Sequence, residues 1–166
     1  MSDLTIKIGE LWTGSEGTSK SFSLDMPVDL KDPEIKPTSN LKAEVSLYKL
    51  KGQITAVVRD FELDIELQYA DSGKKFVYPI RIAEIERQFL PEQPKKVEDL
   101  FDLYLINLKD QTIDLTEMLR QEIILHFPMV SVDSKSLNKK LSEKYMKSGD
   151  DPDSHKPFKD LKKLIK

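Results

Sequence analysis

Carboxylates, lysines and hydroxyls are the groups that this chain offers for chemistry. It holds no cysteine, and its two histidines, His126 and His155, are not spaced to share a metal. A thiolate nucleophile, a disulfide framework, a zinc ribbon and an iron–sulfur cluster are therefore excluded. The six glycines form neither a G-x-G-x-x-G pattern nor a P-loop, and residues 13–19 are interpreted as a flexible connection.

Three carboxylates alternate along one predicted strand: Glu62, Asp64 and Glu66. Alternation places them on one face of a sheet, where a hydrolase would use paired carboxylates as general acid and base. Strand faces are also acidic for solubility alone, and we favour this second interpretation. We therefore expect a protein that is not an enzyme and that binds no cofactor, metal or small-molecule substrate.

Residues 135–166 are rich in lysine, with ten lysines, five acidic residues and a net charge of +5. The whole chain carries −3, so residues 1–134 carry −8. A basic segment of this kind is typical of contact with an anionic partner, although a solvated polar face over weak packing gives the same pattern. The candidate nucleic-acid-binding residues are Lys139, Lys140, Lys144, Lys147, Lys159, Lys162 and Lys163.

The elements that would position these groups begin with a predicted strand over residues 41–48, where apolar and polar residues alternate. Lys51-Gly52 is predicted as a tight turn into an antiparallel partner strand. The apolar positions of that strand change parity after Val58 and resume at Phe61. In a strand that continued without interruption, the apolar residues after Val58 would point to the solvent face. We therefore predict a β-bulge near Arg59-Asp60.

The next hairpin is predicted with Ser72-Gly73 as a two-residue turn. In that register apolar residues face each other in the pairs Tyr69 with Phe76, Leu67 with Tyr78, Ile65 with Ile80 and Leu63 with Ile82. Opposite charges pair on the other face, Asp64 with Arg81 and Asp71 with Lys74. Pro79 cannot donate to a ladder, so its strand is predicted to be an edge there or to leave that position unpaired.

A helix is predicted over residues 114–127. Asp114-x-x-Glu117 has the form of a capping box, with Ile113 and Met118 placed for a hydrophobic staple, and Pro128 ends the helix. Weaker strands are predicted at 4–8, 21–24 and 103–107, and helical segments after 135. Residues 26–39 and 90–99 are predicted connections. The fold class is therefore α+β and mainly antiparallel β, with a curved sheet or small barrel-like domain over 1–130 and a lysine-rich helical segment over 131–166.

Three stretches of the chain together resemble a known family. They are Ile65–Tyr69 with Phe76–Ile80, then Ile113–Ile123 closing on Phe127-Pro128-Met129, and finally Asp151-Pro152-Asp153 with Phe158–Leu164. In order and spacing they resemble the YceD family, the large-ribosomal-RNA-subunit accumulation proteins of bacteria and plastids. The likeness covers most of the chain and is weakest over residues 13–40.

The chain departs from the family pattern at its cysteines. Typical members carry a C-x-x-C pair at the hairpin turn, which aligns with Tyr69 and Ser72 here, and a further cysteine cluster after the Pro-Met pair. The second region, around Asp133, Leu137, Leu141 and Lys144, holds no cysteine. If those cysteines bind zinc in relatives, this protein is expected to stabilise the segment by leucine and tyrosine packing instead.

The resemblance implies a non-enzymatic role in the synthesis, processing or stability of large-subunit ribosomal RNA. The expected partner is then a ribosomal RNA precursor or a ribosomal protein. The alternative is an adaptor or chaperone for a basic ribosomal protein that never contacts RNA. No apolar run reaches the roughly 18 residues of a membrane-spanning helix, and the first residues do not resemble a secretory signal, so we expect a cytoplasmic protein without a membrane partner.

Overall fold

The computed structural model describes residues 4–95, 103–133, 135, 138–139 and 141–143. The chain divides into two compact units. The first comprises Met1–Gln68 and Lys74–Met129, and the second comprises Tyr69–Gly73 and Val130–Lys166. All of the helices and strands named below belong to the first unit. The predicted domain boundary at residue 130 stays a prediction.

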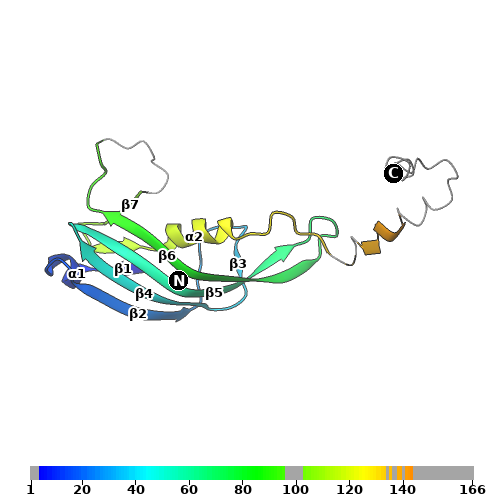
Figure 1. The fold of residues 1–166 in the computed structure, drawn as a ribbon, viewed down its shortest axis with the longest axis horizontal. Helices are drawn as coiled ribbons and strands as arrows, with labels where there is room; N and C mark the ends of the chain where they lie inside the picture. The colour runs from blue at the N-terminus through cyan, green and yellow to red at the C-terminus, as the bar shows by residue number, and fades with distance from the viewer. Residues whose placement is uncertain (1–3, 96–102, 134, 136–137, 140, 144–166) are drawn as a thin grey trace, which may run out of the picture. The chain divides into compact units, whose positions relative to one another are not determined.

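The first unit contains eight strands and two helices among its described residues (Figure 1). In chain order they are β1 (Thr5–Lys7), α1 (Gly9–Thr13), β2 (Ser19–Met26), β3 (Lys36–Pro37), β4 (Leu41–Leu50), β5 (Gln53–Gln68), β6 (Lys75–Leu90), β7 (Tyr104–Leu105), β8 (Thr112–Asp114) and α2 (Thr116–Leu125). The short strands β3 and β8 and the helix α1 were not predicted, and β3 lies inside the predicted connection 26–39.

The main sheet has the strand order β2-β4-β5-β6-β7, with β3 paired to the far end of β5, while β1 and β8 form a separate two-stranded sheet. Every pair is antiparallel except β6 with β7. The first unit is therefore α+β with mostly antiparallel strands, as predicted. Of the two predicted forms, the curved sheet is the one observed, because the strand order remains open and does not close into a barrel.

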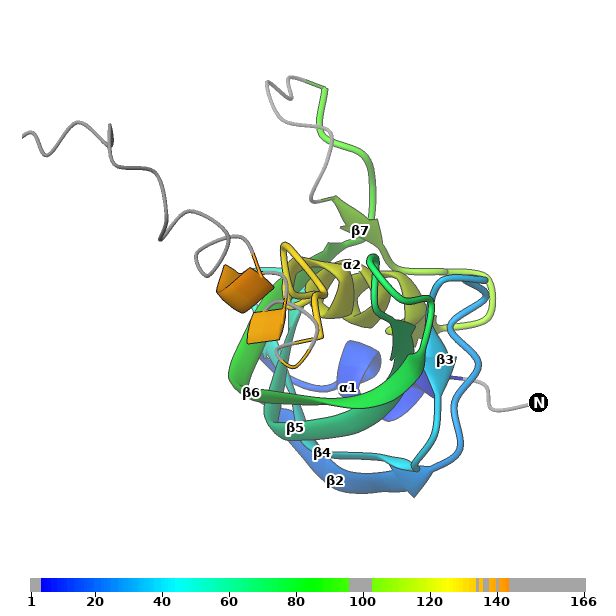
Figure 2. The same ribbon diagram turned by 90° about the vertical axis from the view of Figure 1, so that its right-hand side faces the viewer.

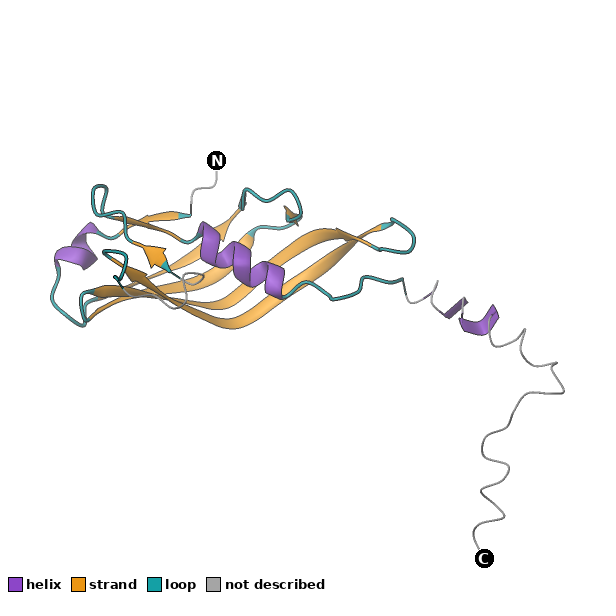
Figure 3. Ribbon diagram, turned by 90° about the horizontal axis from the view of Figure 1, so that it is seen from above, coloured by secondary structure: helices purple, strands orange, loops and turns teal. Residues whose placement is uncertain are grey.

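The core lies on the concave face of this sheet. Figure 2 shows the long strands curving around α1 and α2, and Figure 3 shows α2 lying along the sheet. The helix contributes three fully buried side chains, Met118, Leu119 and Ile123, to the same apolar cluster as the inward-facing residues of β4, β5 and β6. Burial of this apolar cluster is the main contribution to the stability of the folded state.

The predicted turn between β4 and β5 is confirmed. Lys51 and Gly52 have φ angles of 53° and 68°, and Leu50 pairs with Gln53, as in a two-residue type I′ hairpin. The main-chain N–H groups of Lys51 and Gly52 donate to the two carboxylate oxygens of Glu16, at 2.6 and 3.1 Å. The glycine-containing segment 13–19, interpreted as a flexible connection, is thus hydrogen-bonded to the turn.

The predicted bulge is also confirmed. Lys42 pairs with Glu62 but Glu44 pairs with Arg59, so β5 carries one extra residue opposite β4. Asp60 lies in this extra stretch with a φ of 50°, which is unusual for a residue other than glycine. The partner strand β6 changes parity at the same level, because Ala83 and Glu84 are exposed opposite exposed Arg59 and Asp60. Both strands therefore shift their buried faces together.

The predicted register of the β5–β6 hairpin is wrong by two residues. Leu67 pairs with Phe76, Ile65 with Tyr78 and Leu63 with Ile80, so the strands are joined by residues 69–74 and not by a two-residue turn. The apolar face is the predicted one, because a shift of two residues preserves the alternation. Pro79 lies on an edge, as predicted, because among the described residues β7 pairs with β6 only at Phe89 and Leu90.

The predicted capping box does not form: the N-cap residue of α2 is Leu115, which makes no side-chain cap hydrogen bond, and Asp114 is the last residue of β8. The Asp114 carboxylate accepts the N–H of Thr116 at 2.8 Å, which satisfies one of the free donors of the first turn. The Glu117 carboxylate does not return to Asp114 and is bonded to Arg120 and Gln121 instead. The helix ends before Pro128, as predicted.

Candidate functional site

Of the seven candidate nucleic-acid-binding lysines, only Lys139 lies in the described part of the chain. Its side chain is exposed, and its carbonyl oxygen accepts the hydroxyl of Ser142 at 2.9 Å. Residues 135, 138–139 and 141–143 are helical, in agreement with the predicted helical character of this segment. Lys140, Lys144, Lys147, Lys159, Lys162 and Lys163 lie outside the described residues.

Within the second unit, the tip of the β5–β6 hairpin contacts the segment that begins at Val130. The N–H of Ala70 donates to the carbonyl oxygen of Ser131 at 2.8 Å, and the N–H of Asp133 lies 3.5 Å from the carboxylate of Asp71. These are the two regions in which the family resemblance implies cysteines. They are hydrogen-bonded neighbours in this chain, although neither supplies a thiol.

The alternating carboxylates Glu62, Asp64 and Glu66 share one face of β5, as predicted. Each lies beside a cation: Arg81 is 2.9 Å from Asp64 and 4.0 Å from Glu62, and Lys75 is 2.9 Å from Glu66. Glu62, Arg81 and Lys75 have side chains about half exposed, and Asp64 and Glu66 about a third. Ion pairs this accessible to solvent contribute little stability. The carboxylates are thus arranged as cross-strand ion pairs, an arrangement typical of a solvated sheet face.

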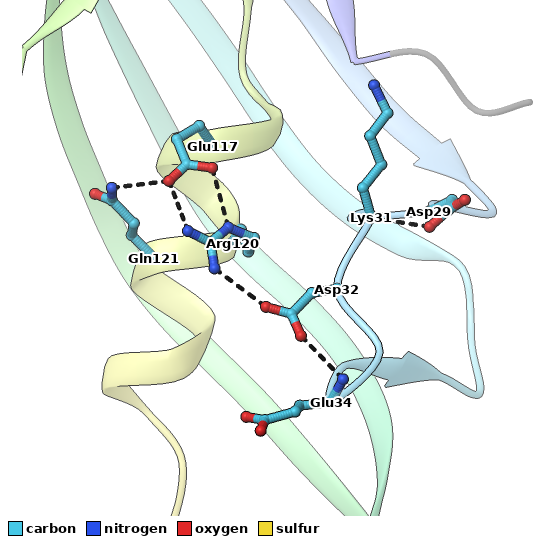
Figure 4. Close-up of polar contacts among 7 residues, drawn as sticks. All are labelled: Asp29, Lys31, Asp32, Glu34, Glu117, Arg120 and Gln121. Atoms are coloured by element: carbon cyan, nitrogen blue, oxygen red, sulfur yellow. Dashed lines mark hydrogen bonds and ion pairs between the residues drawn. The ribbon is translucent and has the colours of Figure 1, made fainter.

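A network of polar side chains joins α2 to the loop before β3 (Figure 4). Arg120 donates to both carboxylate oxygens of Glu117, at 3.0 and 2.7 Å, and to the carboxylate of Asp32 at 3.1 Å. Gln121 also donates to Glu117 at 3.0 Å, and the second oxygen of Asp32 accepts the N–H of Glu34 at 2.9 Å. Arg120 therefore fixes a loop that is 88 residues away in sequence.

These contacts shift the proton affinities of the three charged groups. The pKa of Asp32 is lowered, chiefly by the N–H of Glu34 and further by Arg120. The hydrogen bonds from Arg120 and then from Gln121 lower the pKa of Glu117, and the two carboxylates raise the pKa of Arg120. All three groups are charged at neutral pH, so the network acts as a salt-bridged clamp.

We expect this clamp to make stability depend on pH in the acid range. A carboxylate whose pKa is lowered by folding stabilises the protein above its unfolded pKa, about 3.9 for Asp and 4.3 for Glu, and loses that contribution as pH falls through the folded value. In Arg120→Gln the free energy of unfolding should be lower at neutral pH and should fall less steeply on acidification. Urea unfolding over the acid range measures this, with Lys75→Gln as the control from an exposed pair. Parallel curves for Arg120→Gln and the wild type would contradict it.

Two further contacts tie the polar side of α2 to the sheet. Arg87 of β6 donates to Glu122 at 2.8 Å, and both side chains are mostly buried. Tyr104 of β7 donates to Gln121 at 2.6 Å. The roles of Arg87 and Arg120 were not predicted from the sequence. The sequence signal for them is the run of long polar residues at 120–122 between apolar residues of the helix, and it does not reveal which segments they contact.

The surface of the first unit has several open hollows. One hollow of about 360 Å³ is lined by Lys7, Glu10, Lys20, Asp110 and neighbouring residues. His126 is exposed, with its Nδ1 atom 2.8 Å from the carbonyl oxygen of Glu122. Across the described residues, no three histidine, aspartate or glutamate side chains are grouped to hold a metal ion.

Comparisons with protein families, with curated proteins and with solved structures found no match to this chain. In the part of the chain that the structure describes, no helix has both the length and the apolar character needed to cross a bilayer.

Proposed function

We propose that this protein acts without catalysis in the synthesis, processing or stability of large-subunit ribosomal RNA. The observation that carries the proposal is the pairing of the hairpin tip with residues 131–133. The YceD family carries cysteines in both of these regions, which would lie together if the cysteines bind one zinc ion, and here the regions are hydrogen-bonded without any cysteine. These contacts support the resemblance, and they are independent of the sequence motifs on which it was based.

The charge distribution suggests how such a factor would work. Residues 1–134 carry a net charge of −8 and residues 135–166 a net charge of +5. The first part therefore suits a basic partner and the second an acidic one. The lysine-rich segment would contact RNA phosphates, and the acidic domain would contact a protein of the ribosomal precursor. Localisation in the cytoplasm is part of this proposal.

Loss of the protein tests the proposal directly. In cells from which the gene is deleted or depleted, the ratio of mature large-subunit to small-subunit ribosomal RNA should fall. Re-expression of the full chain should restore it. A ratio that stays unchanged while the protein is absent would overturn the proposal, whichever molecule the protein contacts.

A second function is favoured by the acidic charge of residues 1–134 alone. A protein with that charge would serve as an adaptor or chaperone for a basic ribosomal protein without contacting RNA. Affinity capture of the full chain before and after nuclease digestion separates the two functions. A basic partner retained after digestion supports the adaptor, and a partner lost on digestion supports RNA contact.

A further inference from the structure

Strand β2 is the outermost strand of the main sheet, and β4 is the only strand among the described residues that pairs with it. The N–H of Lys49 donates to the carbonyl oxygen of Thr18 at 2.9 Å, which makes this a hydrogen-bonded pair. In an antiparallel ladder such pairs alternate, so the even-numbered residues of β2 face β4. The main-chain groups that point outward are those of Ser19, Ser21, Ser23 and Asp25.

This edge has neither a bulge nor a proline to block an added strand, although Lys20 places one charged side chain on its concave side. Its register with β4 is continuous over eight residues, without a bulge, and it contains no proline. The opposite long strand differs, because Pro79 interrupts the donors along the outer edge of β6. Of the two long margins of the sheet, β2 is therefore the one that can accept another strand.

The side chains on the concave side of β2 are incompletely covered. Phe22 and Leu24 pack against the core but remain partly exposed, and Met26 is half-buried as well, whereas Ala43 and Val45 on the neighbouring strand β4 are buried. A further strand beside β2 would cover these apolar side chains with its own alternate residues. Burial of that surface adds to the free energy from the main-chain hydrogen bonds.

The convex side beside β2 is acidic. A hollow of about 330 Å³ next to the bulge is lined in part by Asp25, Glu44 and Asp60, with Lys42 as the single basic residue. The surrounding chain, residues 1–134, carries −8. A lysine or arginine on the outer face of an added strand would therefore lie in a favourable field, and a carboxylate would not.

We propose that the outer edge of β2 binds an extended basic segment of a partner protein as an additional strand, with apolar residues beside Phe22 and Leu24 and cationic residues beside Asp25. The inference rests on the edge, the partly covered side chains and the charges around the hollow. It does not depend on a role in ribosomal RNA metabolism, and it is tested separately.

A synthetic peptide of about eight residues that alternates lysine with valine is a suitable probe, since it can pair over the whole length of β2. Its binding to the full chain is measured by fluorescence anisotropy, and amide hydrogen exchange locates the site. The amides of Ser19, Ser21, Ser23 and Asp25 should exchange slowly only when the peptide is present. A peptide with glutamate in place of lysine should bind at least about tenfold more weakly.

The variants Ser21→Pro and Ser21→Ala form a matched pair, because both remove the hydroxyl that contacts Ser46 and only the proline removes the outward N–H. Ser21→Ala should bind the peptide like the wild type, and Ser21→Pro should lose binding. If Ser21→Pro does not fold, hydrogen exchange on the wild type tests whether the peptide binds at β2.

Protection elsewhere in the chain would overturn the proposal. Concentration-dependent protection of β2 without peptide would also overturn it, because a second copy would then be the occupant.

Discussion

Replacement of Phe61 by alanine is expected to lower the free energy of unfolding by about 3–5 kcal/mol. Phe61 is 1% exposed and is among the largest fully buried side chains of the core. It is the first inward-facing residue after the bulge, so its ring fills the position at which β5 changes its buried face. Such a loss is a large part of the roughly 5–15 kcal/mol of a typical domain. Urea unfolding monitored by circular dichroism measures it.

Val77→Ala on β6 is the control for this experiment. Val77 is 59% exposed, so its truncation should change the free energy of unfolding by no more than about 0.5 kcal/mol. Similar losses in Phe61→Ala and Val77→Ala would show that the ring of Phe61 does not fill a packed core. The arrangement of β5 described above would then be wrong at the bulge.

The second large effect is expected for RNA binding by the lysine-rich segment. Simultaneous replacement of Lys139, Lys140, Lys144 and Lys147 by glutamine removes four positive charges. Each lysine that neutralises a phosphate contributes about 0.7–0.9 to the slope of log affinity against log salt concentration, so the slope should fall by about three. Binding to fragments of large-subunit RNA, titrated at several salt concentrations, measures this change.

A variant with four glutamines in the first unit controls for net charge. Lys7, Lys36, Lys42 and Lys109 are exposed and lie outside the lysine-rich segment, so their replacement should leave the slope nearly unchanged. Equal slopes for the wild type and the segment variant would remove the segment from RNA binding. Equal decreases in both variants would show that only total charge matters.

The faces of the long strands could be predicted from the sequence because side-chain alternation has a period of two. Leu41, Val45 and Leu47 are buried as the pattern required, and the interruption at Arg59-Asp60 marked the bulge. Each of these inferences depends on residues that are neighbours along the chain or across a short turn. Local pattern and burial therefore agree over most of β4 and β5.

The register of the β5–β6 hairpin could not be predicted in the same way. A shift by two residues leaves every side chain on its own face, so apolar pairing alone fits both registers. The charges did not decide it either, because Arg81 reaches Asp64 diagonally at 2.9 Å while its direct partner is Glu62. The contacts of residues 69–73 within the second unit add a constraint that lies outside the hairpin sequence.

The contacts around α2 were beyond prediction for a different reason. Two ion pairs join segments that are far apart in sequence: Arg120 with Asp32, and Arg87 with Glu122. The identity of a single residue does not indicate which distant residue it contacts. The strand β8 was missed for the same reason, because its three residues pair with β1 near the N-terminus, more than 100 residues earlier in the sequence. By contrast, the end of α2 before Pro128 depends on residues that are neighbours in sequence, and it could be predicted.

The simultaneous change of buried face in β5 and β6 limits how this hairpin can change in length. If one residue were removed at Asp60, the side chains of the later β5 residues would point to the opposite face of the sheet. Strand β6 would still change its buried face at Ala83 and Glu84, so the two strands would no longer match. A compensating deletion on the facing strand would restore the match. Homologous proteins with longer or shorter versions of these strands should therefore have gained or lost residues at both positions together, and a sequence alignment that places a gap on one strand alone is misaligned there.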